Sequence, residues 1–498
     1  MFKKVNLLIV NFMKSLCLLL FTIINIKAIA QPAIYWGDEM VVDDGATYGN
    51  LRPRISLSAD GNPIVLFGKG SQGYLYVAKG NGTNFNVPVS ILPSGLNTYL
   101  SYWTGPDLAT TGDTVIVVFK ALPYENGKVY IVRSIDGGLS FSDTIRVDSH
   151  DSGMAWMPAI DMSESGKIVL TYMAHDGVSA DPSYVYSMST DAGLNFSPEI
   201  IIDSAIPGEA CDCCPAEIVI KDDSEVLLYR NNDANVRDIF GVYSSDGGSN
   251  FNGADNVDQM NWDLDYCPST GPDGAITPEG LITVFESKAS GFSRVYVSKS
   301  NMTSELSFTE RIQLNSPTNS AGKQIYPRKA NDGDLMVVTW AEAETSNTEI
   351  YCALSIDGSL NQFNTTKEQV NISTTGVQTN PDVIVNGNEI HIVYQDNNGA
   401  GNVKYRKGIL SGLYLNELEQ KQIIYPNPST GKFQFTLKGF ELGMNPKFEI
   451  QNLKGEIIYK SALSISELEF DLSNQAKGIY FLKIYDENKI YTEKIVIH

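Results

Sequence analysis

The most regular feature of the chain is a pattern of apolar and polar residues that recurs seven times between residues 32 and 407. Each copy begins with a proline, continues through a short apolar stretch and a polar turn, and ends in an apolar run closed by an aromatic residue. Apolar residues alternate with polar ones, and Gly, Asn and Asp separate the runs, which is typical of strands and turns. The prolines are spaced 53, 52, 57, 57, 55 and 54 residues apart: Pro53, Pro106, Pro158, Pro215, Pro272, Pro327 and Pro381.

Each repeat is long enough for four strands. A third strand follows the two of the frame, as at residues 128–134, and a short outer strand comes next, as at residues 198–204. Four strands in a period of about 50 residues are typical of a β-propeller blade. The predicted fold is therefore all-β, a seven-bladed β-propeller over residues 31–407. The seventh repeat lacks an outer strand, so we expect residues 37–43, which precede the first repeat, to complete the last blade and close the ring.

A second motif lies between the third and fourth strands of four repeats. It reads SIDGGLSF at 134–141, STDAGLNF at 189–196, SSDGGSNF at 244–251 and, one residue longer, SIDGSLNQF at 355–363. These segments resemble the Asp-box, or BNR repeat, of the sialidase-like β-propeller superfamily. The Asp can accept backbone N–H groups and the Gly permits a positive φ. The resemblance implies turns at the outer edge of the blades, so the motif indicates the fold and not the chemistry.

The period stops after residue 407, and residues 408–421 are expected to be a linker. Residues 422–498 then read as a small antiparallel β-sandwich. The opening YPNPSTG at 425–431, the strand GIYFLKI at 478–484 and the basic and apolar last strand resemble the type A C-terminal sorting domain of the type IX secretion system. The resemblance implies that the secretion machinery is a partner and that the protein is secreted or held at the outer cell surface.

The N-terminus predicts a first export step. Lys3 and Lys4 precede an apolar run that ends in the small residues AIA at 28–30, so residues 1–30 are expected to be a signal peptide that carries Cys17 away with it. No later run approaches the roughly 18 apolar residues that span a bilayer, and we expect no transmembrane segment. The formal net charge of -21 argues against nucleic acid as a partner. With four histidines in the chain, no His-rich metal site is expected and no cofactor is required.

Two sets of propeller loops meet at one face: the loops that enter each innermost strand and the loops that follow each second strand. The second strands end in one polar residue per repeat: Lys69, Lys120, His175, Arg230, Glu286, Glu342 and Gln395. His and Tyr can act as acid or base, and Arg can neutralise a carboxylate. The candidate catalytic residues are His175, Arg230, Glu286, Glu342 and Tyr326.

The entering loops carry aromatic residues and arginines, among them Arg52. Aromatic faces are platforms for sugar rings, and Arg pairs with carboxylates in a bidentate manner. The candidate substrate-binding residues are Arg54, Tyr102, Trp103, Trp156, Arg237 and Arg328. Packing in the core is the alternative for Trp156.

These residues predict a glycan or glycoprotein ligand. The family resemblance implies a sialidase-like site with an arginine trio, a Tyr nucleophile activated by Glu, and an Asp acid in the first blade region. Residues 61–106 contain no Asp or Glu, so that acid is missing. We therefore expect a propeller that recognises a glycan, with or without cleaving it. A polysaccharide lyase acting on uronate-containing glycans and a carbohydrate- or protein-binding propeller without catalysis are the alternatives.

Four cysteines cluster at two neighbouring loops. Cys211, Cys213 and Cys214 lie on the loop entering blade four, and Cys267 lies on the matching loop of blade five. An oxidising compartment favours a disulfide from Cys267 to Cys213 or Cys214, with a second bridge inside the cluster as an option. Four thiolates also suit a soft metal such as Cu(I) or zinc, which stays open as the alternative. Cys352, on a third strand, is expected to be a buried free thiol.

Overall fold

The computed structural model describes residues 33–45, 49–70, 73–149, 153–175, 181–302, 305–344, 347–397, 401–411, 424–436, 447–452, 454, 456–462, 467–485 and 490–498. The predicted signal peptide lies outside these residues, as do residues 412–421 of the predicted linker. The chain divides into two compact units, Met1–Gly412 and Leu413–His498. The predicted all-β class is confirmed: within the described residues the one helical segment is the short 3₁₀ helix η1 (Leu360–Asn364).

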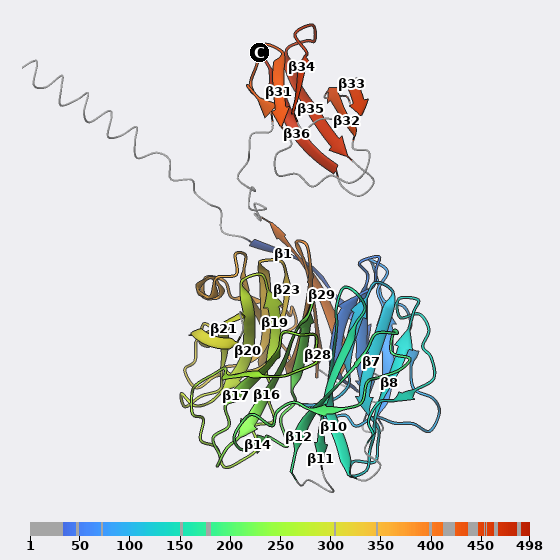
Figure 1. The fold of residues 1–498 in the computed structure, drawn as a ribbon, viewed down its shortest axis with the longest axis vertical. Helices are drawn as coiled ribbons and strands as arrows, with labels where there is room; N and C mark the ends of the chain where they lie inside the picture. Colours follow the sequence, from blue (N-terminus) through green and yellow to red (C-terminus); the bar gives the residue numbers. More distant parts are fainter. Residues whose placement is uncertain are drawn as a thin grey trace, which may run out of the picture. The chain divides into compact units, whose positions relative to one another are not determined.

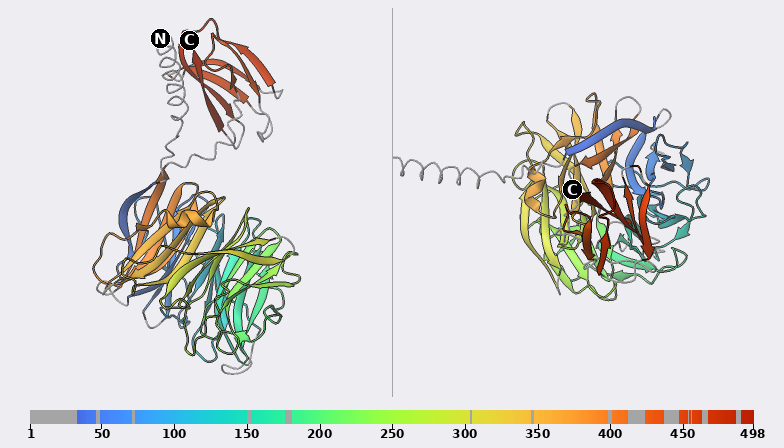
Figure 2. Two further views of the ribbon diagram at one scale, coloured as in Figure 1. Left: turned by 90° about the vertical axis from the view of Figure 1, so that its left-hand side faces the viewer. Right: turned by 90° about the horizontal axis from the view of Figure 1, so that it is seen from above.

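The first unit contains seven sheets, which follow one another in chain order around a common axis (Figure 1 and Figure 2). Each sheet is a blade. Blades one to three contain β2 (Asn50–Leu57), β3 (Pro63–Lys69), β4 (Tyr74–Lys79) and β5 (Val89–Ser90); β6 (Asp107–Thr111), β7 (Thr114–Lys120), β8 (Val129–Ser134) and β9 (Ile145–Arg146); and β10 (Met154–Met162), β11 (Ile168–His175), β12 (Ser183–Ser189) and β13 (Ile200–Ile201).

Blade four differs because its innermost strand is interrupted by the cysteine loop, which leaves two short strands, β14 and β15, both paired with β16. Blades four to seven contain β14 (Glu209–Ala210), β15 (Glu217–Lys221), β16 (Ser224–Asn232), β17 (Ile239–Ser244) and β18 (Gly253–Asn256); β19 (Asp273–Thr277), β20 (Gly280–Ser287), β21 (Arg294–Met302) and β22 (Leu306–Gln313); β23 (Lys323–Asp332), β24 (Leu335–Ala343), β25 (Thr348–Ser355) and β26 (Glu368–Gln369); and β27 (Gln378–Asn386), β28 (Glu389–Asp396), β29 (Asn402–Ser411) and β1 (Ala33–Asp43).

The N-terminal strand closes the ring, as the sequence predicts. β1 pairs antiparallel with β29, from Ala33 opposite Ser411 to Asp43 opposite Val403. β29 thus extends beyond the boundary expected at residue 407. Glu39 on β1 pairs with Lys404 at 3.1 Å and accepts the Tyr394 hydroxyl, so β1 is attached to the last blade by side chains as well as by backbone.

Carboxylates on the innermost strands join neighbouring blades around the central channel. An innermost strand has one edge without a strand partner, and its N–H groups need acceptors. Asp side chains of the preceding blade supply them: Ile55 N–H donates to Asp382 at 2.9 Å, Ile160 to Asp107 at 3.3 Å, Ile220 to Asp161 at 2.9 Å and Lys329 to Asp273 at 3.0 Å. These Asp residues are therefore structural.

A carboxylate or amide that follows the outer strand fixes the start of the third strand in several blades. Asp148 accepts Val129 N–H, Asp203 accepts Tyr184 N–H and Asn371 accepts Ile350 N–H, each at 2.7 Å. The outer strands themselves are short: β9 and β13 each have two residues. The side-chain acceptor therefore adds a hydrogen bond where the outer strand is too short to make many backbone hydrogen bonds with the third strand.

Replacing Asp203 by Ala is expected to lower the free energy of unfolding by about 1–3 kcal/mol, because a buried N–H loses its acceptor. Asp203→Asn is the matched control, since Asn371 performs the same role. Burial raises the pKa of Asp203 from 3.8 to about 6, against the hydrogen bond from Tyr184. The Asp203 carboxyl therefore binds its proton more tightly in the folded protein than in the unfolded chain. Its contribution to the free energy of unfolding is largest below about pH 4 and is lost as the pH rises through 6. Urea unfolding across this range should show a weaker pH dependence for Asp203→Asn than for the wild type; a dependence remains because the pKa of Asp161 is also raised to about 6 by burial.

The segments that resemble an Asp-box form local turns of the kind that their sequence predicts. Asp136 accepts the N–H groups of Leu139 and Ser140 at 3.0 Å, and Gly138 N–H donates to the Ser134 hydroxyl at 2.9 Å. Gly138 has a φ of 82°, which glycine adopts without strain. The segments at 189–196 and 244–251 repeat these contacts through Asp191 and Asp246. The turns are self-contained and lie next to the outer strands.

The second unit contains two antiparallel sheets with one apolar core, as the sequence predicts. One sheet has the order β30 (Ile424–Tyr425), β31 (Lys432–Thr436) and β34 (Glu467–Asp471); the other has the order β33 (Ile457–Ala462), β32 (Lys447–Asn452), β35 (Gly478–Tyr485) and β36 (Ile490–Ile497). Its buried core includes Phe433, Phe448, Ile450, Phe470 and Leu482.

Candidate functional site

Four innermost strands carry the same irregularity just before the repeated proline. β2, β10, β23 and β27 each shift register there, so that an extra residue is inserted relative to the neighbouring strand. The residue before the proline has a positive φ in all four blades: 45° at Arg52, 52° at Met157, 54° at Tyr326 and 49° at Asn380. Non-glycine residues seldom adopt this conformation, and such bulges re-aim side chains. Three of the four residues in this conformation are polar, namely Arg52, Tyr326 and Asn380.

These residues border a narrow well at the end of the channel where the loops enter the innermost strands, which we call the upper well. It is lined by Arg52, Arg54, Trp103, Asp107, Glu217, Tyr326, Arg328, Asn380 and six of the seven repeated prolines, Pro53 excepted. Its cavity has a volume of about 60 Å³. A carboxylate group fits so narrow a space more readily than a whole sugar ring does.

The opposite part of the channel is a wider cavity of about 480 Å³, and its charges are paired. Arg328 contacts three carboxylates: Glu217 at 2.9 Å, Asp382 at 3.1 Å and Asp273 at 3.2 Å. Arg54 pairs with Asp107 at 3.3 Å. Burial raises the pKa of Glu217 to about 8, against the attraction of Arg328. Arg54 and Arg328, predicted to bind a substrate carboxylate, are therefore engaged by carboxylates of the channel itself.

Arg52 makes no ion pair with any of the described residues. It is 9% exposed, and its Nε atom has no hydrogen-bond partner in the part of the chain that the structure describes. Burial, and then the positive charges of Arg54 and Arg328, lower the pKa of the Arg52 guanidinium, while the charge of Asp107 opposes the shift. Because arginine stays protonated in proteins even so, the upper well contains a buried cation without an ion-pair partner among the described residues. The sequence places Arg52 in an entering loop but does not distinguish it from Arg54. The bulge that turns their side chains in different directions cannot be recognised from the order of apolar and polar residues.

Tyr326 lies beside Arg52 in the upper well. Burial raises the pKa of Tyr326 to about 12, with Glu286 and Tyr102 adding to the shift and Arg52 opposing it. The phenol is thus a neutral hydrogen-bond donor. Glu286 is buried, and its carboxylate is held by hydrogen bonds from Ser293, Thr270 and the backbone N–H of Tyr326, while burial raises its pKa. Glu286 therefore positions the backbone of Tyr326 and does not itself line the well.

The other polar residues at the ends of second strands are inside the blades. Arg230 is fully buried and donates to the carbonyls of Arg237 at 2.6 Å and Glu286 at 2.9 Å. Glu342 accepts from Gln324 and Trp340, each at 3.0 Å. His175 is buried opposite Met154 in the β10–β11 pair. The sequence placed these three residues at the well because their strand ends are equivalent, but the innermost strand lies between each of them and the channel.

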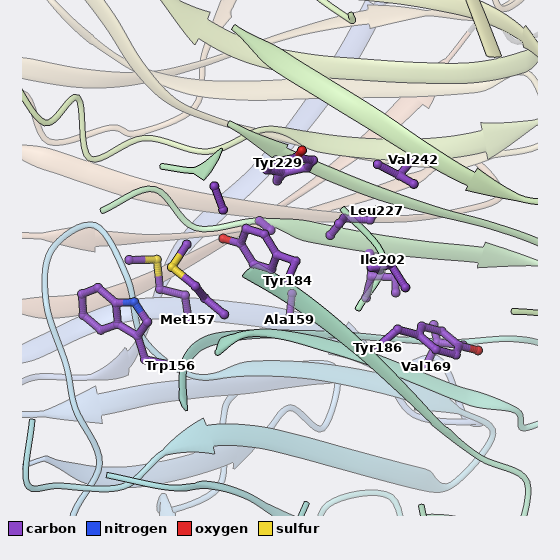
Figure 3. Packing of buried hydrophobic residues seen from close by; sticks show 14 of the residues in the cluster. Trp156, Met157, Ala159, Val169, Tyr184, Tyr186, Ile202, Leu227, Tyr229 and Val242 are labelled. Atoms are coloured by element: carbon purple, nitrogen blue, oxygen red, sulfur yellow. The ribbon is translucent and has the colours of Figure 1, made fainter. Parts of the chain in front are cut away.

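The predicted aromatic platforms divide into core and surface. Trp156 is 3% exposed and packs against Tyr99, Trp103 and Tyr124 with ring centroids 5.2–5.8 Å apart, so the core alternative is the one the structure shows. Figure 3 shows Trp156 beside Met157 in the buried cluster that joins blades three and four. Trp103 lines the upper well, and Tyr102 is 60% exposed. Tyr102 remains available to a ligand.

The cysteine cluster contains the predicted disulfide. Cys213 is bonded to Cys267, which resolves the two pairings left open by the sequence. Cys211 and Cys214 are buried free thiols with their Sγ atoms 2.9 Å apart, and Cys352 is a buried free thiol, as predicted. Arg237, predicted to bind substrate, donates to Cys211 Sγ at 3.0 Å and to the Leu264 carbonyl at 3.0 Å.

Arg54 and Arg328 were predicted at the channel, whereas the acidic part of its lining was not, although the sequence contains a signal for it. The residue directly after the repeated proline is charged in five of seven blades: Arg54, Asp107, Asp273, Arg328 and Asp382, with Ala159 and Ala216 in the other two. Positive and negative residues both occur at this position. Such a mixture is typical of residues that pair with one another, whereas a site for a charged ligand would carry residues of one sign. Within the described residues, no helix is long and apolar enough to cross a membrane.

The propeller is similar to several solved structures. A protein of unknown function from Dyadobacter fermentans is 13% identical with a TM-score of 0.46, covering 76% of this chain and 99% of its own. The GH93 α-L-arabinofuranosidase of Fusarium graminearum is 14% identical with a TM-score of 0.40, covering 61% and 93%. The Trypanosoma rangeli sialidase is 8% identical with a TM-score of 0.43, covering 93% and 89%.

No curated protein matches the chain in sequence. Residues 423–498 match the family model described as the secretion system C-terminal sorting domain. The match coincides with the two-sheet second unit, whose first described strand begins at Ile424. The chain therefore ends in a C-terminal sorting domain of the type IX secretion system, which marks the protein for secretion or display at the cell surface.

Proposed function

We propose that the propeller binds an acidic glycan at the upper well, with the carboxylate of a uronate or sialate residue held by Arg52. The observation that carries this proposal is the buried guanidinium of Arg52, which makes no ion pair within the described residues, in a channel where Arg54 and Arg328 are both paired. An Arg–carboxylate contact is strong when water is excluded, and a ligand that lacks the carboxylate would leave the charge uncompensated.

The size of the well determines how the ligand is oriented. A cavity of about 60 Å³ admits the carboxylate group and leaves the sugar ring at the mouth. Tyr102 is exposed beside the mouth and offers an aromatic face for the ring. Tyr326, as a neutral phenol, can donate a hydrogen bond to the carboxylate or to a ring hydroxyl.

Binding without cleavage fits the chemistry of the well better than hydrolysis does. A Tyr nucleophile needs activation, whereas the pKa of Tyr326 is raised. The carboxylates that line the well are engaged, Asp107 by Arg54 and Glu217 by Arg328. His175, the base of the lyase alternative, does not line the well. The sorting domain would present this binding propeller outside the cell.

The proposal predicts selective binding of short acidic oligosaccharides. Short ligands are required because the net charge of -21 repels a long polyanion. In saturation-transfer NMR we expect signal transfer to a uronate disaccharide and none to the same disaccharide with its carboxyl group reduced to an alcohol. Prolonged incubation should yield neither new reducing ends nor an unsaturated, ultraviolet-absorbing product. Equal transfer to both sugars would contradict the proposal, and product formation would favour the enzymatic alternatives.

A further inference from the structure

Three of the four clustered cysteines have their sulfur atoms in contact distance. Cys211 Sγ lies 2.9 Å from Cys214 Sγ and 3.5 Å from Cys213 Sγ, and Cys213 is bonded to Cys267. A free thiol pair thus lies against an existing disulfide. The proposed glycan site uses none of these groups.

The surroundings of Cys211 favour its thiolate. Arg237 Nη1 donates to Cys211 Sγ at 3.0 Å. The hydrogen bond from Cys214, followed by the charges of Arg230 and Arg237, lowers the pKa of Cys211 to about 7, while burial raises the pKa of Cys214. The thiolate is the nucleophile in disulfide exchange, so Cys211 is the group suited to attack.

Burial differs along the cluster. Cys211 and Cys214 are 0% and 1% exposed, Cys213 is half-buried, and Cys267 is exposed. External reagents can therefore reach the Cys267 sulfur. The buried thiols of Cys211 and Cys214 can react with such reagents indirectly, by exchange with the Cys213–Cys267 disulfide.

We propose that these four cysteines form an internal thiol–disulfide exchange centre, in which one disulfide moves between Cys213–Cys267 and Cys211–Cys214. In the first step the Cys211 thiolate attacks Cys213 Sγ, the Cys213–Cys267 bond breaks, and Cys267 leaves as a thiolate. In the second step the Cys214 sulfur attacks Cys211 Sγ, Cys213 leaves as a thiolate, and the proton of Cys214 passes to the Cys213 sulfur, which lies 4.0 Å from Cys214 Sγ. Two thiols and one disulfide are present before and after, so no oxidant is needed.

The geometry favours exchange over a metal centre. Two thiolates on a tetrahedral zinc ion with Zn–S bonds of about 2.3 Å stand about 3.8 Å apart, whereas Cys211 and Cys214 are 2.9 Å apart. Cys213 is not available as a ligand because it is bonded to Cys267. The guanidinium of Arg237, 3.0 Å from Cys211 Sγ, would also repel a metal cation bound there.

The exchange alters the connection between blades. The Cys213–Cys267 bond joins the loop entering blade four to the loop entering blade five, and Cys214 directly precedes the repeated Pro215. Moving the disulfide to Cys211–Cys214 leaves a bridge within one loop and frees the other. The centre is thus a redox-sensitive clip on the rim of the propeller.

A trapping experiment on the full chain tests the proposal without depending on the position of the equilibrium. Native protein is incubated with N-ethylmaleimide in the absence of reductant, and its peptides are mapped by mass spectrometry without reduction. We expect Cys267 and Cys213 to become alkylated over time while a Cys211–Cys214 disulfide accumulates. Cys211→Ser should abolish this labelling. Cys352→Ser, which removes a buried thiol outside the cluster, is the matched control and should behave as the wild type.

Arg237→Gln tests the positioning of the thiolate. It should slow Cys267 labelling about fivefold at pH 7 and shift the pH midpoint of the rate upward, because raising a pKa of about 7 by one unit lowers the thiolate fraction at pH 7 from about one half to about one tenth. The proposal is overturned if Cys267 stays unlabelled in folded wild-type protein, or if Cys211 is alkylated while Cys213–Cys267 remains intact. One bound metal ion per chain in elemental analysis would overturn it in favour of a metal site.

Discussion

Replacing Arg328 by Met is expected to lower the free energy of unfolding by about 3–5 kcal/mol, because it leaves buried carboxylates without their counter-charge. Arg328 contacts Glu217, Asp273 and Asp382, which come from blades four, five and seven. Its loss therefore affects strands from several blades at once. Chemical denaturation of the full chain, followed by tryptophan fluorescence, measures the change.

Lys299→Met is the matched control for the Arg328 substitution. Lys299 pairs with Glu279, whose side chain is 56% exposed, and such surface pairs contribute at most about 1 kcal/mol. The deficit of Arg328→Met should also shrink as the pH falls below neutrality, because Asp273 then takes up a proton: burial raises its pKa, and the charge of Arg328 that outweighs burial in the wild type is gone. Glu217, whose pKa is raised to about 8, is already protonated at neutral pH. A loss below about 1 kcal/mol at neutral pH would mean that the channel charges do not hold the blades together.

Deleting residues 33–43 is expected to remove the cooperativity of propeller unfolding. β1 is the outer strand of the last blade and buries Ile34 and Val42, each contributing about 1.5–3 kcal/mol. Glu39 and Trp36 add contacts to Lys404 and Glu368. Calorimetry should show a broad transition at a lower temperature in place of a single sharp one.

The deletion has both a control and a rescue. Tyr35 is 67% exposed, so Tyr35→Ser should leave the transition unchanged. A synthetic peptide with the sequence of residues 33–43, added in excess, should restore part of the lost stability by pairing with β29. An unchanged transition in the deletion variant would contradict the closure of the ring by β1.

The fold was predictable because its signals are local and repeated. The seven prolines mark the innermost strands, and the Asp-box motifs mark the outer turns through contacts within a few residues, as at Ser134 and Asp136. The closure of the ring could be predicted because the seventh repeat lacks an outer strand, while one additional strand precedes the first repeat. The short outer strand predicted at residues 198–204 is present as β13, Ile200–Ile201, and the carboxylate of Asp203 supplements its ladder.

The site was less predictable because it depends on the directions of side chains. Arg52 and Arg54 are two residues apart and both line the upper well, yet across the bulge only Arg54 pairs with a carboxylate, that of Asp107. The ends of the second strands occupy equivalent positions in the repeats, which suggested that their polar residues form the rim of one pocket. Arg230 and Glu342 instead make their hydrogen bonds inside the blades. The pairing of Cys267 with Cys213 and not Cys214 was likewise a matter of loop geometry beyond the spacing.

The most direct test of the proposed function is a binding cycle that varies the protein and the ligand together. Isothermal titration would compare wild type and Arg52→Gln, each with a uronate disaccharide and with its carboxyl-reduced form. We expect Arg52→Gln to weaken binding of the acidic sugar by about 100-fold, equivalent to a charge-assisted contact of about 2–3 kcal/mol, and to leave the reduced sugar nearly unaffected. Equal effects on the two sugars, or none on either, would contradict a carboxylate held by Arg52.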